Sequence, residues 1–390
     1  MAGLSLHGLS SGRAALKHIT VMIKPASSIC DMRCNYCFYK DVAASRQRAS
    51  YGFMSRETAL ALINNVFCVL SAGDNITFAF QGGEPGLVGL EFFSFFIGEA
   101  DKAMPPGVQA HYALQTNGLM IDDNWCKLFK ANNFLVGLSL DGYIALHNQN
   151  RIDSGGKGTF SQVIKAKKLL ELHNVDYNIL SVITAETARH TGKLWDFILR
   201  EKIRHIQFIP CLEPLNGGAH PKTALTGERF YQFYSTLFRL WKREAVKGNF
   251  ISVRLFNELA ALLVAGQRAP CGLSGRCSPQ IIIEADGSAY PCDFYVLDGH
   301  YIGNLADENL QVIFEKVAAS DFLQETRQRP KRCTDCTHNI WCKGGCKRMA
   351  GTVYGDSCGM RLFLDECLED FLAVVCHSIP SNRPLRYLSR

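Results

Sequence analysis

The chain has 390 residues, of which 47% are apolar, so it can bury a large core and is typical of a globular protein rather than a disordered one. The net charge of +6 does not indicate nucleic-acid binding, because Lys and Arg are scattered without a basic stripe. No run is apolar and long enough to cross a bilayer, and the N-terminus lacks the apolar core of a secretory signal, so we expect a cytoplasmic protein without membrane contact.

Short β-rich runs alternate with amphipathic helical patterns through most of the first 247 residues. Six strand-then-helix units predict a parallel sheet with right-handed crossovers. Six units can form either an open β/α barrel or a doubly wound sheet. The predicted strands lie near residues 18–24, 76–81, 109–115, 134–140, 177–183 and 204–210, with helical patterns such as SRETALALINNVFCVL, LEFFSFFIGEA, FSQVIKAKKLLELH and HTGKLWDFILRE between them.

A cysteine loop follows the first predicted strand, where parallel α/β folds place their active sites. It holds Cys30, Cys34 and Cys37. Three thiolates on one short loop can bind three irons of a 4Fe–4S cluster and leave the fourth iron open for another ligand. Zinc is the alternative, but it prefers four protein ligands and no fourth candidate lies near this loop. The spacing therefore favours an open, reactive cluster.

Two further motifs lie at the ends of predicted strands. QGGEP at 81–85 ends the second strand, and its two glycines allow the backbone to approach a ligand closely, although alone it is also typical of an ordinary turn. Ser139 and Arg151 follow the fourth strand, and an arginine can hold a carboxylate through its planar fork. On composition alone, however, Arg151 is a surface arginine.

The pattern changes after about residue 265, where cysteines become dense and helices short. IIIEADGSAYPCDFY predicts a hairpin turned on Asp286-Gly287. We expect a metal-stabilised domain over 248–376 and a tail at 377–390, because the segment has too little apolar sequence for its own core. Sixteen cysteines in a reducing compartment indicate metal ligation. Eight of them make two four-thiolate sites, for which spacing alone leaves iron–sulfur and zinc open.

The chain resembles the anaerobic sulfatase-maturating enzymes, which are radical S-adenosylmethionine (SAM) enzymes with a SPASM domain. The resemblance implies an α/β fold, with a partial, six-unit parallel β/α barrel over 15–247 and a C-terminal iron–sulfur SPASM domain. The cysteine loop and QGGEP are shared by the superfamily, whereas PCDFYVLD with the paired cysteine sets is more selective. The resemblance is carried by IKPASSICDMRCNYCFYKD, FAFQGGEPGLVGLEFF, LQTNG, FLVGLSLDG, HNQNR, TARH, PCDFYVLD and CKGGCKR.

The resemblance also implies SAM and three 4Fe–4S clusters as cofactors. Cys30, Cys34 and Cys37 would hold the SAM cluster. The positions implied for SAM binding are Tyr36, Gly82, Gly83, Glu84, Ser139, Arg151 and Leu212. The first auxiliary cluster would be held by Cys271, Cys277, Cys292 and Cys346. The second would be held by Cys333, Cys336, Cys342 and Cys367, with Cys358 and Cys376 as competitors for the last place.

The implied activity is oxidation of a Cys or Ser in a sulfatase Cys/Ser-x-Pro/Ala-x-Arg motif to Cα-formylglycine. Asp293 matches the family's proton acceptor, and Gln81, Gln115 and Asn117 are candidates for contacts with the peptide. The implied partners are an unfolded sulfatase polypeptide and a reduced ferredoxin- or flavodoxin-type electron donor. The alternatives are another SPASM peptide maturase, forming thioethers or epimers, or a non-enzymatic iron–sulfur carrier or zinc scaffold. The sequence does not choose between Cys and Ser.

Overall fold

The computed structural model describes residues 18–215, 223–325 and 331–378. Its first six strands are parallel and stand side by side in chain order, which confirms the predicted units. A doubly wound sheet would reverse its order at a switch point, so the continuous order identifies a barrel wall. The strands are β1 His18–Ile23, β2 Asn75–Phe80, β3 Gln109–Thr116, β4 Leu135–Ser139, β5 Asp176–Ile183 and β6 His205–Pro210.

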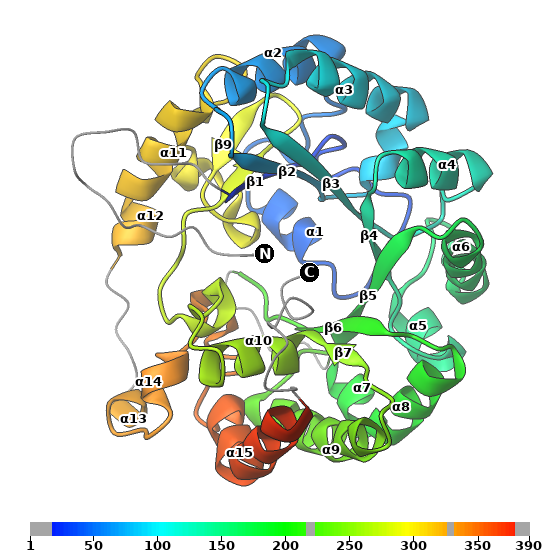
Figure 1. The fold of residues 1–390 in the computed structure, drawn as a ribbon, viewed down its shortest axis with the longest axis vertical. Coiled ribbons are helices and arrows are strands. Elements are labelled where there is room, and N and C mark those ends of the chain that lie inside the picture. Colours follow the sequence, from blue (N-terminus) through cyan, green and yellow to red (C-terminus); the bar gives the residue numbers. More distant parts are fainter. Residues whose placement is uncertain (1–17, 216–222, 326–330, 379–390) are drawn as a thin grey trace.

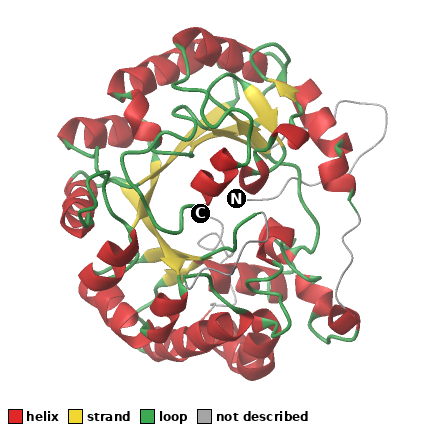
Figure 2. Cartoon of the chain, turned by 180° about the vertical axis from the view of Figure 1, so that it is seen from behind, coloured by secondary structure: helices red, strands yellow, loops and turns green. Residues whose placement is uncertain are grey.

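Helices cover the outside of this curved wall (Figures 1 and 2). Alternation in β2 (NITFAF) buries Ile76, Phe78 and Phe80, and the two phenylalanines meet Phe96 of α3 edge to face. Hydrophobic burial of such side chains, about 1.5–3 kcal/mol each, holds each helix on the wall. The helices of the barrel part are α1 Phe38–Ala44, α2 Arg56–Phe67, α3 Leu90–Ala103, α4 Asp123–Ala131, α5 Ile144–Asn150, α6 Phe160–Leu172, α7 Ala185–Arg189, α8 Thr191–Arg200 and α9 Gly227–Val246, with the 3₁₀ helix η1 Pro85–Val88.

The C-terminal part continues the same sheet. Strand β8 (Ile281–Ile283) pairs in parallel with β1, and β9 (Ser288–Tyr290) returns antiparallel to β8. Their turn contains Gly287 at φ 89°, so the predicted hairpin is confirmed. The other end of the sheet gains β7 (Ser252–Val253) beside β6, and β10 (Gly303–Asn304) adds to β9. The two predicted domains therefore share one ten-stranded sheet.

Short helices dominate the rest of the C-terminal part. The longest, α15, packs along α9 through an aromatic cluster in which Phe238 contacts Phe363 and Phe371. Within the described residues, no helix is long and apolar enough to span a membrane. The helices here are α10 Arg254–Leu263, α11 Leu310–Ala319, α12 Asp321–Gln324, α13 Lys331–Thr334, α14 Asn339–Cys342 and α15 Gly359–Ser378, with η2 Cys271–Leu273, η3 Asp293–Tyr295, η4 Asp298–His300 and η5 Lys347–Met349.

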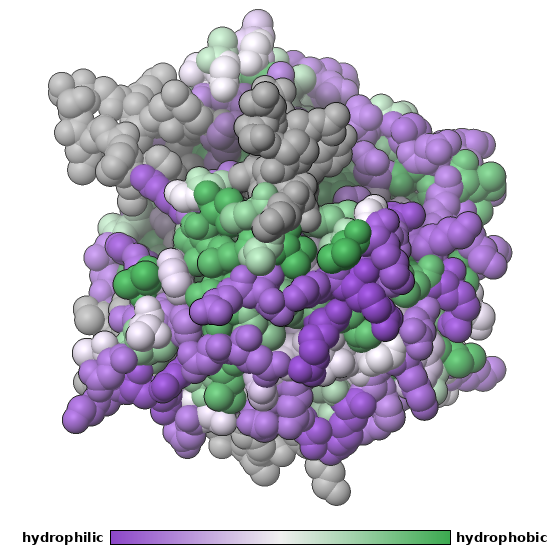
Figure 3. Space-filling view, turned by 60° about the horizontal axis from the view of Figure 1, so that its bottom comes forward, coloured by the Kyte–Doolittle hydropathy of each residue, from purple (hydrophilic) through white to green (hydrophobic). Residues whose placement is uncertain are grey.

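The surface turned forward in Figure 3 is mostly hydrophilic, with apolar atoms gathered in smaller areas between the polar ones. This view brings forward the side of the molecule on which α9 and α15 lie in Figure 1. Their exposed faces carry ion pairs between the two helices, Arg239 with Glu366 at 3.0 Å and Lys242 with Asp370 at 2.8 Å. The aromatic cluster therefore lies beneath a charged outer layer.

Candidate active site

The cysteine loop joins β1 to α1, and α1 lies on the inner side of the barrel wall in both ribbon views (Figures 1 and 2). Backbone hydrogen bonds fasten the loop to the end of α5, from Arg33 N to Ile152 O (2.8 Å) and from Asn35 N to Asn150 O (3.0 Å). Cys37 is the residue directly before α1. The three cysteines therefore sit on an anchored loop at the carboxyl end of the first strand.

The glycine motif lies against this loop. Gly82 and Gly83 have φ of 112° and 55°, which glycine adopts readily and other residues rarely do. A Cβ at Gly82 would come within 2.5 Å of Cε of Lys24, and one at Gly83 would collide with the carbonyl oxygen of Ile29. Glu84 N donates to the same carbonyl (2.8 Å). A thiolate loop beside an open backbone cradle fits an iron–sulfur cluster with SAM on its open iron.

The buried side chain of Glu84 connects the glycine motif to the end of β3 through hydrogen bonds. It is 1% exposed and accepts from Thr116 Oγ1 (2.8 Å), Gly86 N (3.1 Å) and Asn117 N (2.7 Å). Burial raises the pKa of this carboxyl to about 7, against the effect of those donors. Asn117 in turn donates to Asp31 Oδ1 (2.7 Å). The side chains of Glu84 and Asn117 are therefore both hydrogen bonded within the protein. Glu84 positions the glycine motif, whose backbone is left to contact a ligand.

The expected SAM contacts Tyr36 and Arg151 meet on one buried carboxylate that the sequence analysis did not single out. Asp141 is 1% exposed, and its Oδ2 lies 3.0 Å from Arg151 Nε. The Tyr36 hydroxyl donates to the same oxygen, and the Arg151 guanidinium carbon lies 5.6 Å from the centre of the Tyr36 ring. Burial raises the pKa of Tyr36 well above its usual value. Asp141 therefore fixes both side chains beside the cysteine loop.

His147 is connected to the backbone of Arg151 through Thr159. Burial lowers the pKa of His147 to about 4. Its Nδ1 accepts from Asp141 N (3.4 Å), so Nε2 carries the proton toward Thr159 Oγ1 (3.0 Å). Thr159 Oγ1 in turn donates a hydrogen bond to Arg151 O (3.0 Å).

The remaining expected contacts lie at strand ends along the same edge of the barrel. Gln115 Nε2 donates to Ser139 Oγ (3.1 Å), which joins the ends of β3 and β4. Leu212 follows Cys211, whose N donates to the O of Ile183 (2.9 Å), the last residue of β5. The sheet thus brings Gln115 and Ser139, which are 24 residues apart, into contact.

Asp293 lies between the barrel and the auxiliary cysteines. It is 7% exposed, and its Oδ2 accepts from Tyr39 Oη (2.6 Å) and Gln81 Nε2 (3.1 Å). Its Oδ1 is buried and has no hydrogen-bond partner. Burial raises the pKa of this carboxyl, although Lys24 and the two donors act in the opposite direction. Asp293 therefore offers one unused oxygen with increased basicity.

A buried charge cluster fixes the hairpin that carries Asp293. Glu284 of the β8–β9 turn is fully buried and lies 3.4 Å from Lys24 Nζ and 2.6 Å from Arg46 Nη1. Lys24 also stands 4.6 Å from the ring centre of Tyr39. Burial alone would raise the pKa of Glu284, but the two cations lower it. One carboxylate of the C-terminal part thus forms ion pairs with two cations of the barrel.

The four cysteines expected for the first auxiliary cluster are close enough for their charges to interact. Cys277 responds to charges on Cys271 and Cys346, and so does Cys292. Burial raises the pKa of Cys277 to about 11, and a bound metal would reverse this effect by stabilising the thiolate. Cys277 and Cys292 thus each lie within electrostatic range of Cys271 and Cys346.

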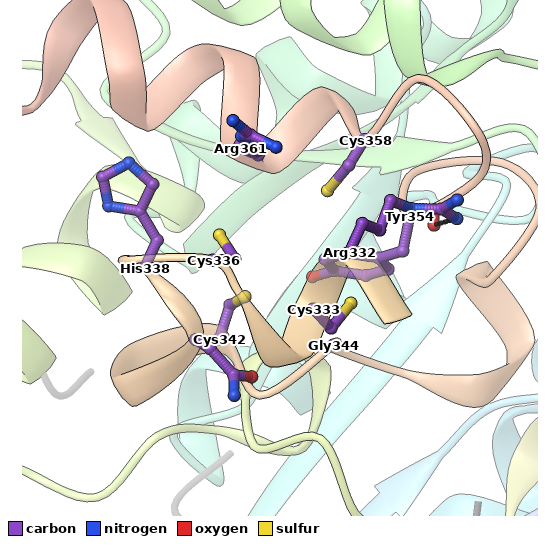
Figure 4. Close-up of a pocket in the computed structure, with 10 residues that line it drawn as sticks. Arg332, Cys333, Cys336, His338, Cys342, Gly344, Tyr354, Cys358 and Arg361 are labelled. Atoms are coloured by element: carbon purple, nitrogen blue, oxygen red, sulfur yellow. Dashed lines mark hydrogen bonds between the residues drawn. The ribbon is translucent and has the colours of Figure 1, made fainter. Parts of the chain in front are cut away.

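The second set requires one correction. Cys333, Cys336, Cys342 and Cys358 line one pocket and their sulfurs point into it (Figure 4). Cys367 is not among them: it is buried in the hydrophobic core at the α9–α15 interface, near Arg239 and Asp370. Cys358 directly precedes α15, whereas Cys367 is nine residues further, about 13 Å along the helix and on its opposite side. The expectation for Cys367 was therefore wrong in its geometry.

Sequence reasoning also missed Tyr39, Lys24 and Asp141. Tyr39 lies two residues after Cys37 on the short helix α1, which had no periodic pattern long enough to predict. Lys24 closes the first strand in an otherwise apolar run. Asp141 stands inside the SLDG motif, and an acid at a strand end facing a candidate arginine was the available signal.

Two family models and several known proteins match this chain. Residues 25–198 match the Radical SAM superfamily and residues 269–337 match SPASM, the iron–sulfur cluster-binding domain. The cysteine-type anaerobic sulfatase-maturating enzyme of Clostridium novyi is 38% identical over 85% of this chain and 89% of its own length. The serine-type enzyme of Klebsiella aerogenes is 29% identical over 84% of this chain and 79% of its own.

Among solved structures, native anSMEcpe with bound AdoMet and Cp18Cys peptide superposes with a TM-score of 0.85 at 35% identity. The match covers 92% of this chain and 99% of that one. The chain thus shares its sequence and its architecture with these relatives over most of its length. The chain belongs to the anaerobic sulfatase-maturating enzymes, radical SAM enzymes that oxidise Cys or Ser to formylglycine.

Proposed function

We propose that this enzyme is of the cysteine type and oxidises a Cys in a Cys-x-Pro/Ala-x-Arg motif of an unfolded sulfatase polypeptide. The preference for Cys is supported by 38% identity to a cysteine-type relative against 29% to a serine-type one. The observation that carries the chemistry is the buried carboxylate of Asp293, with Oδ1 unpartnered. When bound, SAM and its cluster would supply the radical that removes hydrogen from the target Cβ, and the auxiliary clusters would take the second electron. The thioaldehyde that results from Cys is then hydrolysed by water to the aldehyde, and the sulfur leaves as hydrogen sulfide.

The chain's own residues have distinct tasks in this proposal. Asp293 takes the thiol proton as general base, and burial, which raises the pKa of its carboxyl, favours this role. Tyr39 and Gln81 hold Oδ2, so that Oδ1 is directed at the substrate. Gln81 thereby serves the base, and contacts with peptide main chain fall to Gln115 and the 115–117 turn. The glycine cradle, Tyr36, Ser139, Arg151 and Leu212 orient SAM.

We further propose Cys358 as the fourth ligand of the second auxiliary cluster, in place of Cys367. Its position in the same pocket as Cys333, Cys336 and Cys342 supports this assignment. The electron donor is proposed to be a reduced ferredoxin- or flavodoxin-type protein.

The test separates hydrogen abstraction from proton removal. Asp293→Asn keeps the size and loses the basicity, so SAM should still be cleaved while formylglycine falls by a factor on the order of 100 or more. The matched control is Asp298→Asn, an exposed acid of the neighbouring 3₁₀ helix, which should leave the yield unchanged. Near-normal formylglycine from Asp293→Asn would remove Asp293 from the mechanism.

Substrate choice is tested by mass spectrometry after anaerobic incubation with SAM. A Cys peptide should be converted faster than its Ser counterpart, and a Cys peptide with Ala in place of the motif Arg should be converted poorly. Equal conversion without the Arg would favour another SPASM maturase, and faster conversion of Ser would reject the cysteine-type assignment.

A further inference from the structure

We propose that Lys347 sets the reduction potential of the first auxiliary cluster by holding a positive charge beside it under an aromatic cover. This rests on the proposed function and on the expected binding of that cluster by Cys271, Cys277, Cys292 and Cys346. Lys347 would then tune the cluster's readiness to accept the second electron of the oxidation.

The geometry around Lys347 is unusual for a surface lysine. It directly follows Cys346, and its side chain is only 20% exposed. Its Nζ lies 3.6 Å from the ring centre of Phe322 and 5.2 Å from that of Tyr295. These rings pack on each other at 5.3 Å. The ammonium is therefore held in place by two aromatic faces, and the rings restrict water around it.

Lys347 is tied to two members of the cysteine set by position. It directly follows Cys346, and the Tyr295 ring beside its ammonium belongs to a residue whose backbone N donates to Cys292 O (3.0 Å). The neighbouring cation, Arg348, is directed elsewhere, since its Nη2 lies 3.9 Å from Asp41 Oδ2 and donates to Glu213 O. His300 packs on Phe322, and burial and Lys347 both lower its pKa, which favours the neutral ring.

One acid opposes Lys347. Glu325 Oε2 lies 2.7 Å from Lys347 Nζ, and its side chain is 62% exposed. A reduced cluster carries one more negative charge than an oxidised one, so a nearby cation favours reduction and a nearby anion disfavours it. When the substrate-derived radical is oxidised, the cluster is reduced by that one electron. Lys347 should therefore raise the potential, and Glu325 should lower it from the more solvated side of the pair.

The signs of two neutralising variants test the idea. The potential is measured by redox titration in the Cys30/Cys34/Cys37→Ala background, where only the auxiliary clusters remain. Lys347→Gln should lower one of the two midpoints by about tenfold in the reduction equilibrium, or about 59 mV for one electron. Glu325→Gln should raise the same midpoint, so that reduction is favoured about threefold in that equilibrium. Lys347→Arg keeps the charge and should leave the midpoint at the parent value. Lys102, paired with Glu99 at 2.7 Å on α3, provides the control Lys102→Gln, which should shift neither midpoint.

The outcomes are distinguishable. Unchanged midpoints in Lys347→Gln, or shifts of one sign in both Gln variants, with about eight irons retained, would overturn the proposal for Lys347 and leave the proposed function intact. Fewer than about eight irons in the background protein itself would refute the auxiliary-cluster assignment, and the role of Lys347 with it. If Lys347→Gln loses iron, Glu325→Gln, whose side chain is largely exposed, still tests the sign: an unchanged or lower midpoint in that variant would overturn the proposal.

Discussion

The two auxiliary cysteine sets are attached to the barrel in different ways. Three cysteines of the first set flank the β8–β9 hairpin along the chain. This hairpin is hydrogen bonded to β1 and held by the buried ion pairs of Glu284. The second lies on α13, α14 and the start of α15, and reaches the barrel through the packing of α15 on α9. The ion pairs at that second junction are exposed. The first set is thus attached to the barrel sheet, whereas the second set is attached through the packing of one helix, α15.

The different attachments indicate how strongly a change in each cysteine set should affect catalysis. Asp293 adjoins Cys292, so a change in the first set moves the base as well as the cluster. Among the described residues, the pocket of the second set is lined by none of the residues expected to bind SAM. We therefore expect damage to the first set to affect activity most, and damage at the helical junction to affect it least.

The largest effect is expected from Cys292→Ala. Loss of this ligand should remove about four of roughly 12 irons and release Asp293 from its place, so formylglycine should fall at least as far as for loss of a general base, on the order of 10²–10⁴. Iron analysis and product mass spectrometry measure both. A variant with fewer irons but a normal yield would show that the base and the cluster are independent.

Glu284→Gln should destabilise the protein next most strongly. The variant leaves Lys24 and Arg46 buried without their carboxylate, and breaking a buried pair typically costs about 3–5 kcal/mol. Anaerobic denaturant unfolding measures the free energy. Glu91→Gln is the control, since Glu91 is almost fully exposed and 3.9 Å from Arg56. A loss below about 1 kcal/mol would mean that Glu284 does not lock the hairpin.

Cys358→Ala and Cys367→Ala test the second set as a pair. Cys358→Ala should remove about four irons and lower formylglycine about tenfold, because the second cluster is remote from the base. Cys367→Ala should keep all the irons and only lower the unfolding free energy by about 1 kcal/mol through a small cavity. The reverse pattern of iron loss would restore Cys367 as the ligand.

The smallest effect is expected at the helical junction. Lys242→Met removes the exposed ion pair with Asp370, and pairs of this kind contribute about 0–1 kcal/mol. The unfolding free energy should change within that range, with iron content and yield unchanged. A loss of several kcal/mol would show that the surface pairs, rather than the aromatic cluster beneath them, hold α15 on α9.

The sequence predicted what depends on local spacing and missed what depends on tertiary placement. Period-two alternation and the Asp286-Gly287 turn are local, so strands and hairpin were predicted close to their observed bounds. Cys358 directly precedes α15 and Cys367 lies within it, and only the packing of α15 on α9 decides which one faces the other cysteines. Asp141 likewise acquires its role from the folding of Tyr36 and Arg151 onto it.

The parallel pairing of β1 with β8 has a consequence for synthesis of the chain. Val21 emerges from the ribosome early, but its partner Ile281 lies about 260 residues later, which at about 5–20 residues per second means a delay of roughly 13–52 s. During that time the outer edge of β1 offers unpaired N–H and C=O groups, which invite pairing with other chains. A barrel truncated after residue 247 would carry this open edge permanently, so it should aggregate where the full chain does not.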